Sequence, residues 1–295
     1  MEIKTCFASE EEKREYVNLC ETNFVRSVNE CTESLLGGNS IKFITLSGPT
    51  CSGKTTAAKI LTDVLSRYGK RVGLISIDDF YLERRILDSR ERLDYDSIDT
   101  IDIERLKAVV DGIERGDAVE IPIYSFKSGE REGYRNYDSK DSITIFEGIQ
   151  AVYPGIRELF NPKDTKSIYI SVEGEVNVNG IAVSSRTVRL FRRIVRDFEK
   201  RSSSPEFTLR LWESVVTNED ACILPFENEC DYRINSLMGY EICLIKDPLL
   251  RMLDMIDESS SYFEYAQKLK RIFDGTESLS VNYLPKDSLY REFVG

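Results

Sequence analysis

Residues 48–55 read Gly-Pro-Thr-Cys-Ser-Gly-Lys-Thr, the complete pattern G-x-x-x-x-G-K-[ST] of a phosphate-binding loop. In this pattern the glycines let backbone N–H groups turn toward phosphate oxygens. The lysine reaches the β and γ phosphates, and the last hydroxyl ligates magnesium. The octet therefore predicts a site for ATP and Mg²⁺, at the positive end of the helix that follows. The predicted nucleotide contacts are Gly48, Thr50, Cys51, Ser52, Gly53, Lys54, Thr55 and Thr56.

The segments on both sides of the octet predict the fold class. An apolar run at 41–46 is typical of a buried strand, and apolar residues recur at helical spacing after residue 56. Further strands are predicted at 72–77, 143–146, 168–172 and 232–234, and helices at 11–36, 103–113, 186–200, 207–216 and beyond 247. Residues 125–142 predict a hairpin or a long loop, and 82–99 a surface loop.

Alternating strands and helices predict an α/β fold, a doubly wound parallel sheet of the P-loop kinase type with flanking helices. We divide the chain into a helical N-terminal extension (1–40), a P-loop domain (41–245) and a helical C-terminal extension (246–295).

Composition excludes several classes of protein. The net charge is -11, from 51 acidic and 40 basic residues, which argues against nucleic-acid or anionic-membrane partners. The N-terminus has no apolar core of a signal peptide and no run approaches membrane-spanning length, so we expect a cytoplasmic protein. Histidine is absent, which excludes Ser-His-Asp and Cys-His mechanisms. The seven cysteines contain no C-x-x-C pair and favour neither zinc nor a disulfide framework.

Carboxylates follow two of the predicted strands. Glu147 comes directly after 143–146 and is the predicted second contributor to the magnesium shell, beside Thr55. Asp78 and Asp79 follow 72–77, and one of them can take a proton from a hydroxyl acceptor. We choose Asp78 as this base, although the alternation of apolar residues does not decide which carboxylate faces the site.

Residues 186–197 form a basic stretch in an acidic chain. Arg189, Arg192, Arg193 and Arg196 are spaced by three and four, so most lie on one face of a helix. Guanidinium groups bind phosphate oxygens and neutralise a transferring phosphoryl group. The alternative is a solvated face paired with nearby acids; we favour a phosphate role for two of the four arginines.

Five segments in order resemble one family. They are the phosphate loop, Ser76 to Tyr81 (SIDDFY), Pro122 to Arg131 (PIYSFKSGER), Phe146 to Ile149 (FEGI) and Arg189 to Asp197 (RLFRRIVRD). This order resembles the uridine kinase branch of the uridine kinase and phosphoribulokinase family. The stretches 208–228 and 288–295 resemble a sub-branch that is often fused to threonyl-tRNA-synthetase-like modules.

The resemblance implies an ATP-dependent kinase that phosphorylates the 5′-hydroxyl of a pyrimidine nucleoside, uridine or cytidine. It implies Asp78 as base, Glu147 on magnesium, Lys54 with Arg189 and Arg192 as catalytic cations, and Arg196 on ATP. The implied nucleoside contacts are Asp78, Tyr81, Asp94, Tyr124, Phe126, Arg131 and Arg189. Family members are often homo-oligomers, which makes self-association an expectation.

One position departs from the family. Gly129 stands where uridine kinases carry a histidine that reads the pyrimidine edge, and a glycine offers no side chain for this. Two alternatives therefore stay open. The same machinery can act on another hydroxyl compound, such as a sugar phosphate or a pantothenate-like molecule, with Lys127, Arg131 and Arg135 holding a second phosphate. Otherwise the chain can be a non-catalytic module that senses nucleotide.

Overall fold

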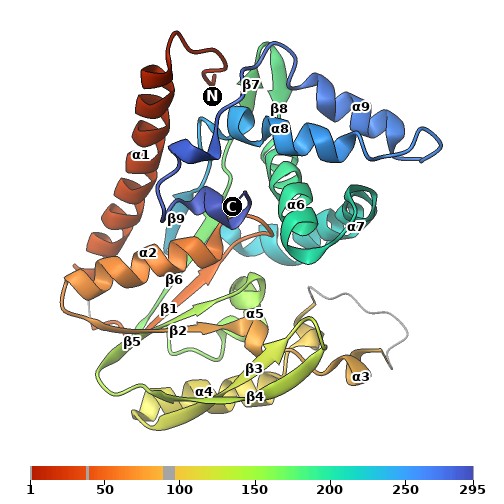
Figure 1. Ribbon diagram of the computed structural model, residues 1–295. Coiled ribbons are helices and arrows are strands. Elements are labelled where there is room, and N and C mark those ends of the chain that lie inside the picture. Colours follow the sequence, from red (N-terminus) through yellow and green to blue (C-terminus); the bar gives the residue numbers. More distant parts are fainter. Residues whose placement is uncertain (1, 38–39, 89–96, 295) are drawn as a thin grey trace.

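A five-stranded parallel sheet forms the centre of the molecule (Figure 1). The computed structural model describes residues 2–37, 40–88 and 97–294. The strands are β1 (Phe43–Ser47), β2 (Arg71–Ser76), β5 (Ser142–Glu147), β6 (Thr165–Ser171) and β9 (Tyr232–Asn235), in the spatial order β2-β5-β1-β6-β9. All four neighbouring pairs are parallel. The predicted α/β fold with a parallel sheet is confirmed.

Alternating side chains on the strands supply two hydrophobic cores. Ile44 of β1 and Ile145 of β5 belong to the core formed with α1 (Glu10–Leu36), α2 (Lys54–Arg67) and α6 (Ser185–Arg201). Phe43 and Phe146, on the same two strands, belong to the other core, which is covered by α4 (Ile103–Arg115). Because both faces of the sheet are covered, β1 and β5 at its centre are buried along their whole length.

The region between β2 and β5 forms a hairpin, one of the two structures that the sequence left open. β3 (Ala118–Ser125) pairs antiparallel with β4 (Glu130–Asp138), and Gly116 in the left-handed conformation ends α4 just before it. A second small hairpin, β7 (Val176–Val178) with β8 (Ile181–Val183), lies outside the predicted strands. The remaining helices are α3 (Arg84–Leu87), α5 (Pro154–Arg157), α7 (Pro205–Asn218), α8 (Glu241–Leu253) and α9 (Phe263–Arg271).

Both ends of the chain pack onto the P-loop domain. The core around α2 and α6 contains Val17 from α1, Leu249 from α8 and Phe293 near the C-terminus. Figure 1 shows the C-terminal tail, residues 288–294 in dark blue, lying close to α2. α8 begins at Glu241, so it crosses the boundary that we placed at residue 245. Among the described residues, no helix combines the length and the apolar character needed to span a membrane.

Candidate nucleotide and acceptor site

The phosphate loop connects β1 to the N-terminus of α2, and its glycines meet tight surroundings. A Cβ atom at position 48 would lie 1.9 Å from the carbonyl oxygen of Ile170. Gly53 has φ +89° and caps α2 in the left-handed conformation, and a Cβ there would lie 2.4 Å from Leu289 Cδ1 of the C-terminal tail. The backbone therefore follows the curled path that the motif requires, with no room for side chains at these two positions.

Hydrogen-bond donors inside the loop can accommodate an anionic ligand. Lys54 Nζ donates to the carbonyl oxygens of Gly48 (2.9 Å) and Pro49 (3.0 Å). Ser52 Oγ is buried and has no hydrogen-bond partner among the described residues. Burial lowers the pKa of Lys54, and the negative charges of Glu147 and Asp78 oppose this shift. A phosphate chain would supply the missing acceptors and the counter-charge, so these residues fit ATP.

Glu147 lies at the carboxyl end of the central strands, as expected. In the sheet register it is opposite Leu46 of β1 and Ser76 of β2, and Ser76 Oγ donates to Glu147 Oε1 at 2.9 Å. Burial raises the pKa of Glu147, while Lys54 and the hydrogen bond from Ser76 oppose that rise. The Thr55 side chain is exposed at the start of α2. The described residues contain no cluster of three metal-ligating side chains. One hydroxyl and one carboxylate suit Mg²⁺, which keeps waters and phosphates as its other ligands.

The two neighbouring aspartates face different surroundings. Both lie in the 3₁₀ turn η1 (Ile77–Phe80) that follows β2. The carboxylate of Asp79 is 4.0 Å from Arg135 of the hairpin and accepts a hydrogen bond from the backbone of Tyr124. Burial raises the pKa of Asp79, and the Arg135 charge lowers it. Asp78, in contrast, is near enough to Lys54 for its charge to raise the pKa of that ammonium group. The charge of Asp79 in turn raises the pKa of Glu147, so both aspartates lie near charged groups of the nucleotide site and the choice of Asp78 as base stays a prediction.

An aromatic cluster follows the aspartates. The ring centroids of Tyr81, Tyr124 and Phe126 lie 5.1–5.7 Å apart, so the structure brings three predicted nucleoside contacts together. Tyr81 is buried and its hydroxyl accepts a hydrogen bond from Gln150 Nε2 at 3.0 Å, whereas 56% of Phe126 is exposed. An exposed ring beside a buried and a half-buried one can stack on a flat ligand.

Arg131 lies next to this cluster but already has partners. It is opposite Tyr124 in the hairpin register, and its Nη2 pairs with Asp102 Oδ2 at 3.0 Å. Its Nη1 donates to the hydroxyl of Tyr134 at 3.3 Å. Asp94, the predicted ribose contact, lies outside the described residues.

The side chain of Arg84 lies at Gly129, the position where uridine kinases carry a histidine. Gly129 has φ +75°, and a Cβ there would lie 2.7 Å from Arg84 Nε. Arg84 also donates through its backbone N–H to Gly129 O (2.8 Å) and through Nη2 to Phe126 O (3.1 Å). The guanidinium group of Arg84 therefore lies over the hairpin turn where a histidine side chain would start.

The structure corrects the predicted role of Arg192. Its side chain is 0% exposed and donates five hydrogen bonds: two to Glu241, two to Ser236 and one to the carbonyl oxygen of Cys51. All N–H groups of a guanidinium are thereby in use, so Arg192 cannot bind a phosphate in this arrangement.

Arg189 is buried in the same manner, against the expectation that it reaches the acceptor and the transferring phosphoryl group. It makes a two-pronged ion pair with Glu219 (2.6 and 2.7 Å) and donates to Thr50 O at 3.2 Å. Arg196 donates to Asp197 Oδ1 through Nε (2.9 Å) and Nη2 (2.7 Å). The structure places its charge near Cys51 of the loop and near Glu292 of the tail.

Three carboxylates near the loop were missed by sequence reasoning. Glu219 lies in a π-helical turn (Glu219–Ile223) after α7, and Glu241 begins α8. Glu292 of the C-terminal tail accepts a hydrogen bond from Thr56 Oγ1 at 3.0 Å. Glu219 and Glu292 lie in the stretches 208–228 and 288–295 that resemble the sub-branch, whereas Glu241 lies outside the quoted segments. The burial of Arg189 and Arg192, which requires such counter-charges, is visible only in the structure.

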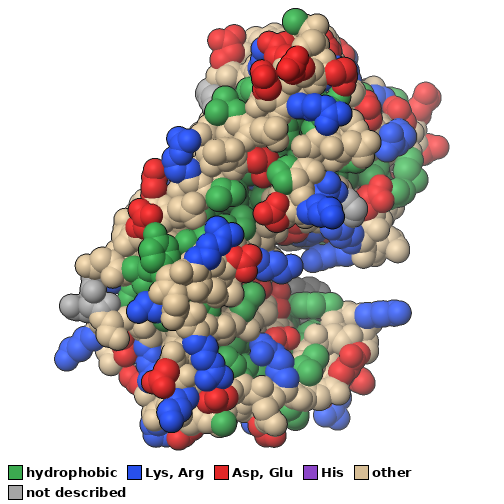
Figure 2. Space-filling view, turned by 60° about the vertical axis from the view of Figure 1, so that its left-hand side comes forward, with side chains coloured by type: hydrophobic (Ala, Val, Ile, Leu, Met, Phe, Trp, Pro, Cys, Tyr) green, Lys and Arg blue, Asp and Glu red, His purple; other side chains and the backbone are tan. Residues whose placement is uncertain are grey.

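A cleft opens on one side of the molecule. Figure 2 shows it as a deep hollow on the right-hand side, with Lys and Arg side chains along both rims and acidic and apolar side chains within. A cleft with cationic rims suits an anionic nucleotide in a protein whose overall charge is negative.

Comparisons with known proteins give both kinases and inorganic pyrophosphatases. The chain is 29% identical over 175 residues to a uridine kinase of Halobacterium salinarum, covering 59% of this chain and 70% of that protein. It is 28% identical over 187 residues to inorganic pyrophosphatase TTM2 of Arabidopsis thaliana, covering 63% of this chain but about a quarter of the relative's length (24%).

A solved structure supports the fold. The YGR205w protein matches with a TM-score of 0.50 at 19% identity, covering 75% of this chain and 94% of the other. The model of the phosphoribulokinase / uridine kinase family matches residues 43–242, which include the phosphate loop, both aspartates, Glu147 and the arginine helix. The chain therefore belongs to the phosphoribulokinase / uridine kinase family.

Proposed function

We propose that this protein transfers the terminal phosphoryl group of ATP to the 5′-hydroxyl of a pyrimidine nucleoside, uridine or cytidine. One observation carries the proposal: the ends of three adjacent parallel strands bring Lys54, Glu147 and Asp78 together beside an exposed aromatic ring. A phosphate cradle, a metal-binding carboxylate and a base next to a platform for a flat ligand are the parts that phosphoryl transfer to a nucleoside needs.

The reaction follows from these positions. The Asp78 carboxylate takes the proton of the 5′-hydroxyl as that oxygen forms a bond to the γ-phosphorus. The bond between this phosphorus and the β–γ bridging oxygen breaks, and ADP leaves. Lys54 stabilises the negative charge on the phosphate oxygens, and the loop N–H groups hold the triphosphate of ATP in line with the attacking hydroxyl oxygen. Thr55 and Glu147 would hold Mg²⁺, which supplies further positive charge to the phosphates.

The aromatic cluster supports a nucleoside as acceptor. Phe126 offers an exposed face beside Tyr81 and Tyr124, and stacking of a base on such a ring contributes about 1–3 kcal/mol. The uridine kinase relative named above is consistent with this acceptor.

The test is release of ADP by the purified protein with ATP, Mg²⁺ and a panel of nucleosides. We expect uridine or cytidine to stimulate turnover and a nucleoside 5′-monophosphate to appear in equal amount. A folded protein that binds ATP but shows no turnover stimulated by any nucleoside would contradict the proposal.

A second candidate is an acceptor that already carries a phosphate. Arg84 supports it, because a guanidinium group at the hairpin turn favours an anion over a neutral pyrimidine edge. The same assay with sugar phosphates in the panel separates the two candidates. In addition, Arg84→Ala is expected to raise the KM of a phosphorylated acceptor strongly and that of a nucleoside only slightly.

A further inference from the structure

Two buried ion pairs lie behind the phosphate loop and contact its backbone. Arg189, paired with Glu219, donates to the carbonyl oxygen of Thr50 at 3.2 Å. Arg192, paired with Glu241, donates to the carbonyl oxygen of Cys51, also at 3.2 Å. These are consecutive carbonyl groups at the crest of the loop, and neither arginine reaches a phosphate in this arrangement.

The geometry of the peptide group gives these contacts a consequence. In a planar trans peptide, the C=O of one residue and the N–H of the next point in opposite directions. Fixing the Thr50 carbonyl toward Arg189 therefore directs the Cys51 N–H away from it. Fixing the Cys51 carbonyl toward Arg192 directs the Ser52 N–H away in the same sense.

Hydrogen bonds inside the loop show toward which side of the loop the Ser52 N–H group points. The backbone N–H of Ser52 donates a hydrogen bond to the carbonyl oxygen of Pro49, with an N···O distance of 3.3 Å. The same oxygen also accepts a hydrogen bond from Lys54 Nζ at 3.0 Å. The Ser52 N–H thus points to the side of the loop on which the lysine lies, where the phosphates are expected.

We propose that Glu219 and Glu241 are positioning residues of the nucleotide site. They hold Arg189 and Arg192 on two loop carbonyl groups, and so keep the Cys51 and Ser52 N–H groups on the side of the loop where the phosphates are expected. This inference rests on the proposed binding of ATP, but it does not depend on the acceptor.

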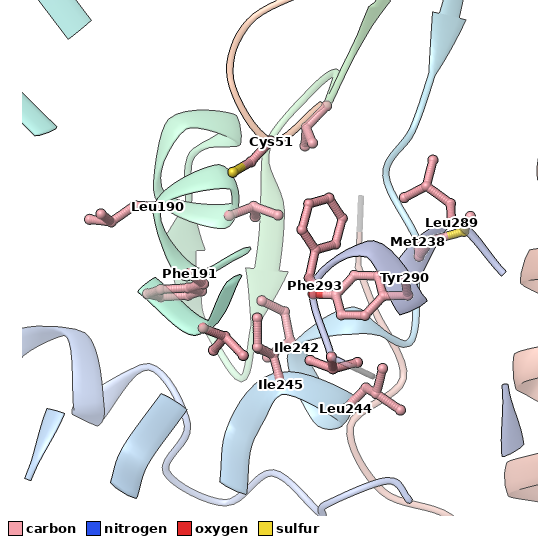
Figure 3. Packing of buried hydrophobic residues seen from close by; sticks show 14 of the residues in the cluster. Cys51, Leu190, Phe191, Met238, Ile242, Leu244, Ile245, Leu289, Tyr290 and Phe293 are labelled. Carbon is pink, nitrogen blue, oxygen red and sulfur yellow. The ribbon is translucent and has the colours of Figure 1, made fainter. Parts of the chain in front are cut away.

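The surroundings of the second pair support its role. Arg192 also donates to Ser236 O at 2.7 Å, and its guanidinium group lies 5.1 Å from the ring centroid of Phe293 and 5.5 Å from that of Tyr290. Figure 3 shows these two rings close to Cys51 and to the labelled side chains of α8. Five hydrogen bonds and two aromatic rings therefore fix the position of the Arg192 guanidinium group against the carbonyl oxygen of Cys51.

The experiment measures ATP binding directly, without acceptor, and follows hydrogen exchange of the loop amides. For Glu241→Gln and Glu219→Gln we expect the Kd for ATP to rise about tenfold or more. We also expect faster hydrogen exchange at the backbone amides of Cys51 and Ser52. Ser236→Ala removes only one hydrogen bond of Arg192 and replaces Glu241→Gln as the test if that variant does not fold. It should raise the Kd for ATP by a smaller factor.

Two controls separate positioning from stability. Glu229→Gln breaks an ion pair with Arg157, which is not among the residues that contact the loop, and should leave the Kd unchanged. Val28→Ala, in the core of α1, should lower the Tm without changing the Kd. If Glu241→Gln and Val28→Ala weaken ATP binding equally at equal loss of Tm, the inference is overturned. It is also overturned if Glu241→Gln folds and binds ATP like the wild type. Failure of the wild type to bind ATP would instead refute the proposed function.

Discussion

The nucleotide side and the acceptor side of the cleft are built differently. Behind the phosphate loop, Arg189 and Arg192 are buried in ion pairs and the tail residue Phe293 is fully buried. On the acceptor side the hairpin β3–β4 leaves Phe126 and Tyr134 exposed. The loop is thus held in shape before any ligand arrives, whereas the hairpin presents side chains that a ligand would cover.

This difference explains why the arginine helix misled sequence reasoning. A run of arginines predicts contact with phosphate because guanidinium groups suit phosphate oxygens. In this protein, two of them instead bind backbone carbonyl groups from behind the loop. Positive charge near a phosphate site can therefore serve to shape the loop, and the exposure of each side chain decides between the two roles.

The largest expected effect is a loss of stability on the nucleotide side. Phe293→Ala removes a ring that packs against Tyr290 and Arg192, and should lower the free energy of unfolding by about 3–5 kcal/mol. Denaturant unfolding measures this change. Phe126→Ala, at the exposed ring of the acceptor side, is the matched control and should change it by about 0.5 kcal/mol or less. Equal losses for the two variants would remove the contrast between the sides.

The next effect is a loss of kcat on substitution of Asp78, which lies between the nucleotide side and the acceptor side. Asp78→Asn should lower kcat by roughly 10² or more while the Kd for ATP stays the same, because a general base is lost and the phosphate loop is intact. Steady-state kinetics and equilibrium binding check the two parts. Asp79→Asn is the neighbouring control and should reduce kcat less, since Asp79 faces Arg135. An unchanged kcat in Asp78→Asn would reassign the base.

A smaller effect sharpens the description of the acceptor side. Phe126→Ala should raise the KM of the acceptor about tenfold through lost stacking, and leave the KM of ATP unaltered. Initial rates at varied acceptor and varied ATP measure both constants. Ile123→Ala is the control, because Ile123 is exposed on the same hairpin but lies outside the aromatic cluster. A rise in the KM of ATP alone would assign Phe126 to the nucleotide.

The smallest effect tests how the tail is attached. Ser288 and Tyr240 donate hydrogen bonds to Glu21 of α1, and burial raises the pKa of this carboxyl while those bonds oppose the rise. The folded protein then holds the proton more tightly than the unfolded chain. The corresponding stability is present at low pH and is lost as pH rises through the raised pKa.

Glu21→Gln cannot titrate, so its stability relative to the wild type should increase as the pH rises above about 4.5, the ordinary pKa of a glutamate. Chemical unfolding at several pH values measures this trend. Glu30→Gln, at an exposed position on the same helix, should show a constant difference. A constant difference for Glu21→Gln as well would mean that its folded pKa is not raised.

Local patterns in the sequence were sufficient for most of the sheet and for the ligand-facing groups. Apolar runs predicted four strands of the sheet, the short segment 232–234 predicted the fifth, and the octet at 48–55 predicted the loop. Glu147 and Asp78 could be found because the carboxyl ends of parallel strands meet at one edge. These signals extend over a few residues, so the sequence by itself determined the fold class and the positions of Lys54, Asp78 and Glu147.

Only the tertiary structure decided what supports the loop. Glu219 and Glu241 are 30 and 49 residues from their arginine partners, and Glu292 is 236 residues from Thr56. No periodicity or motif connects residues at such separations, because their pairing depends on how helices and the C-terminal tail pack around the sheet. The sequence thus specified the phosphate loop and the carboxylates at the strand ends, and packing determined which side chains contact them from behind.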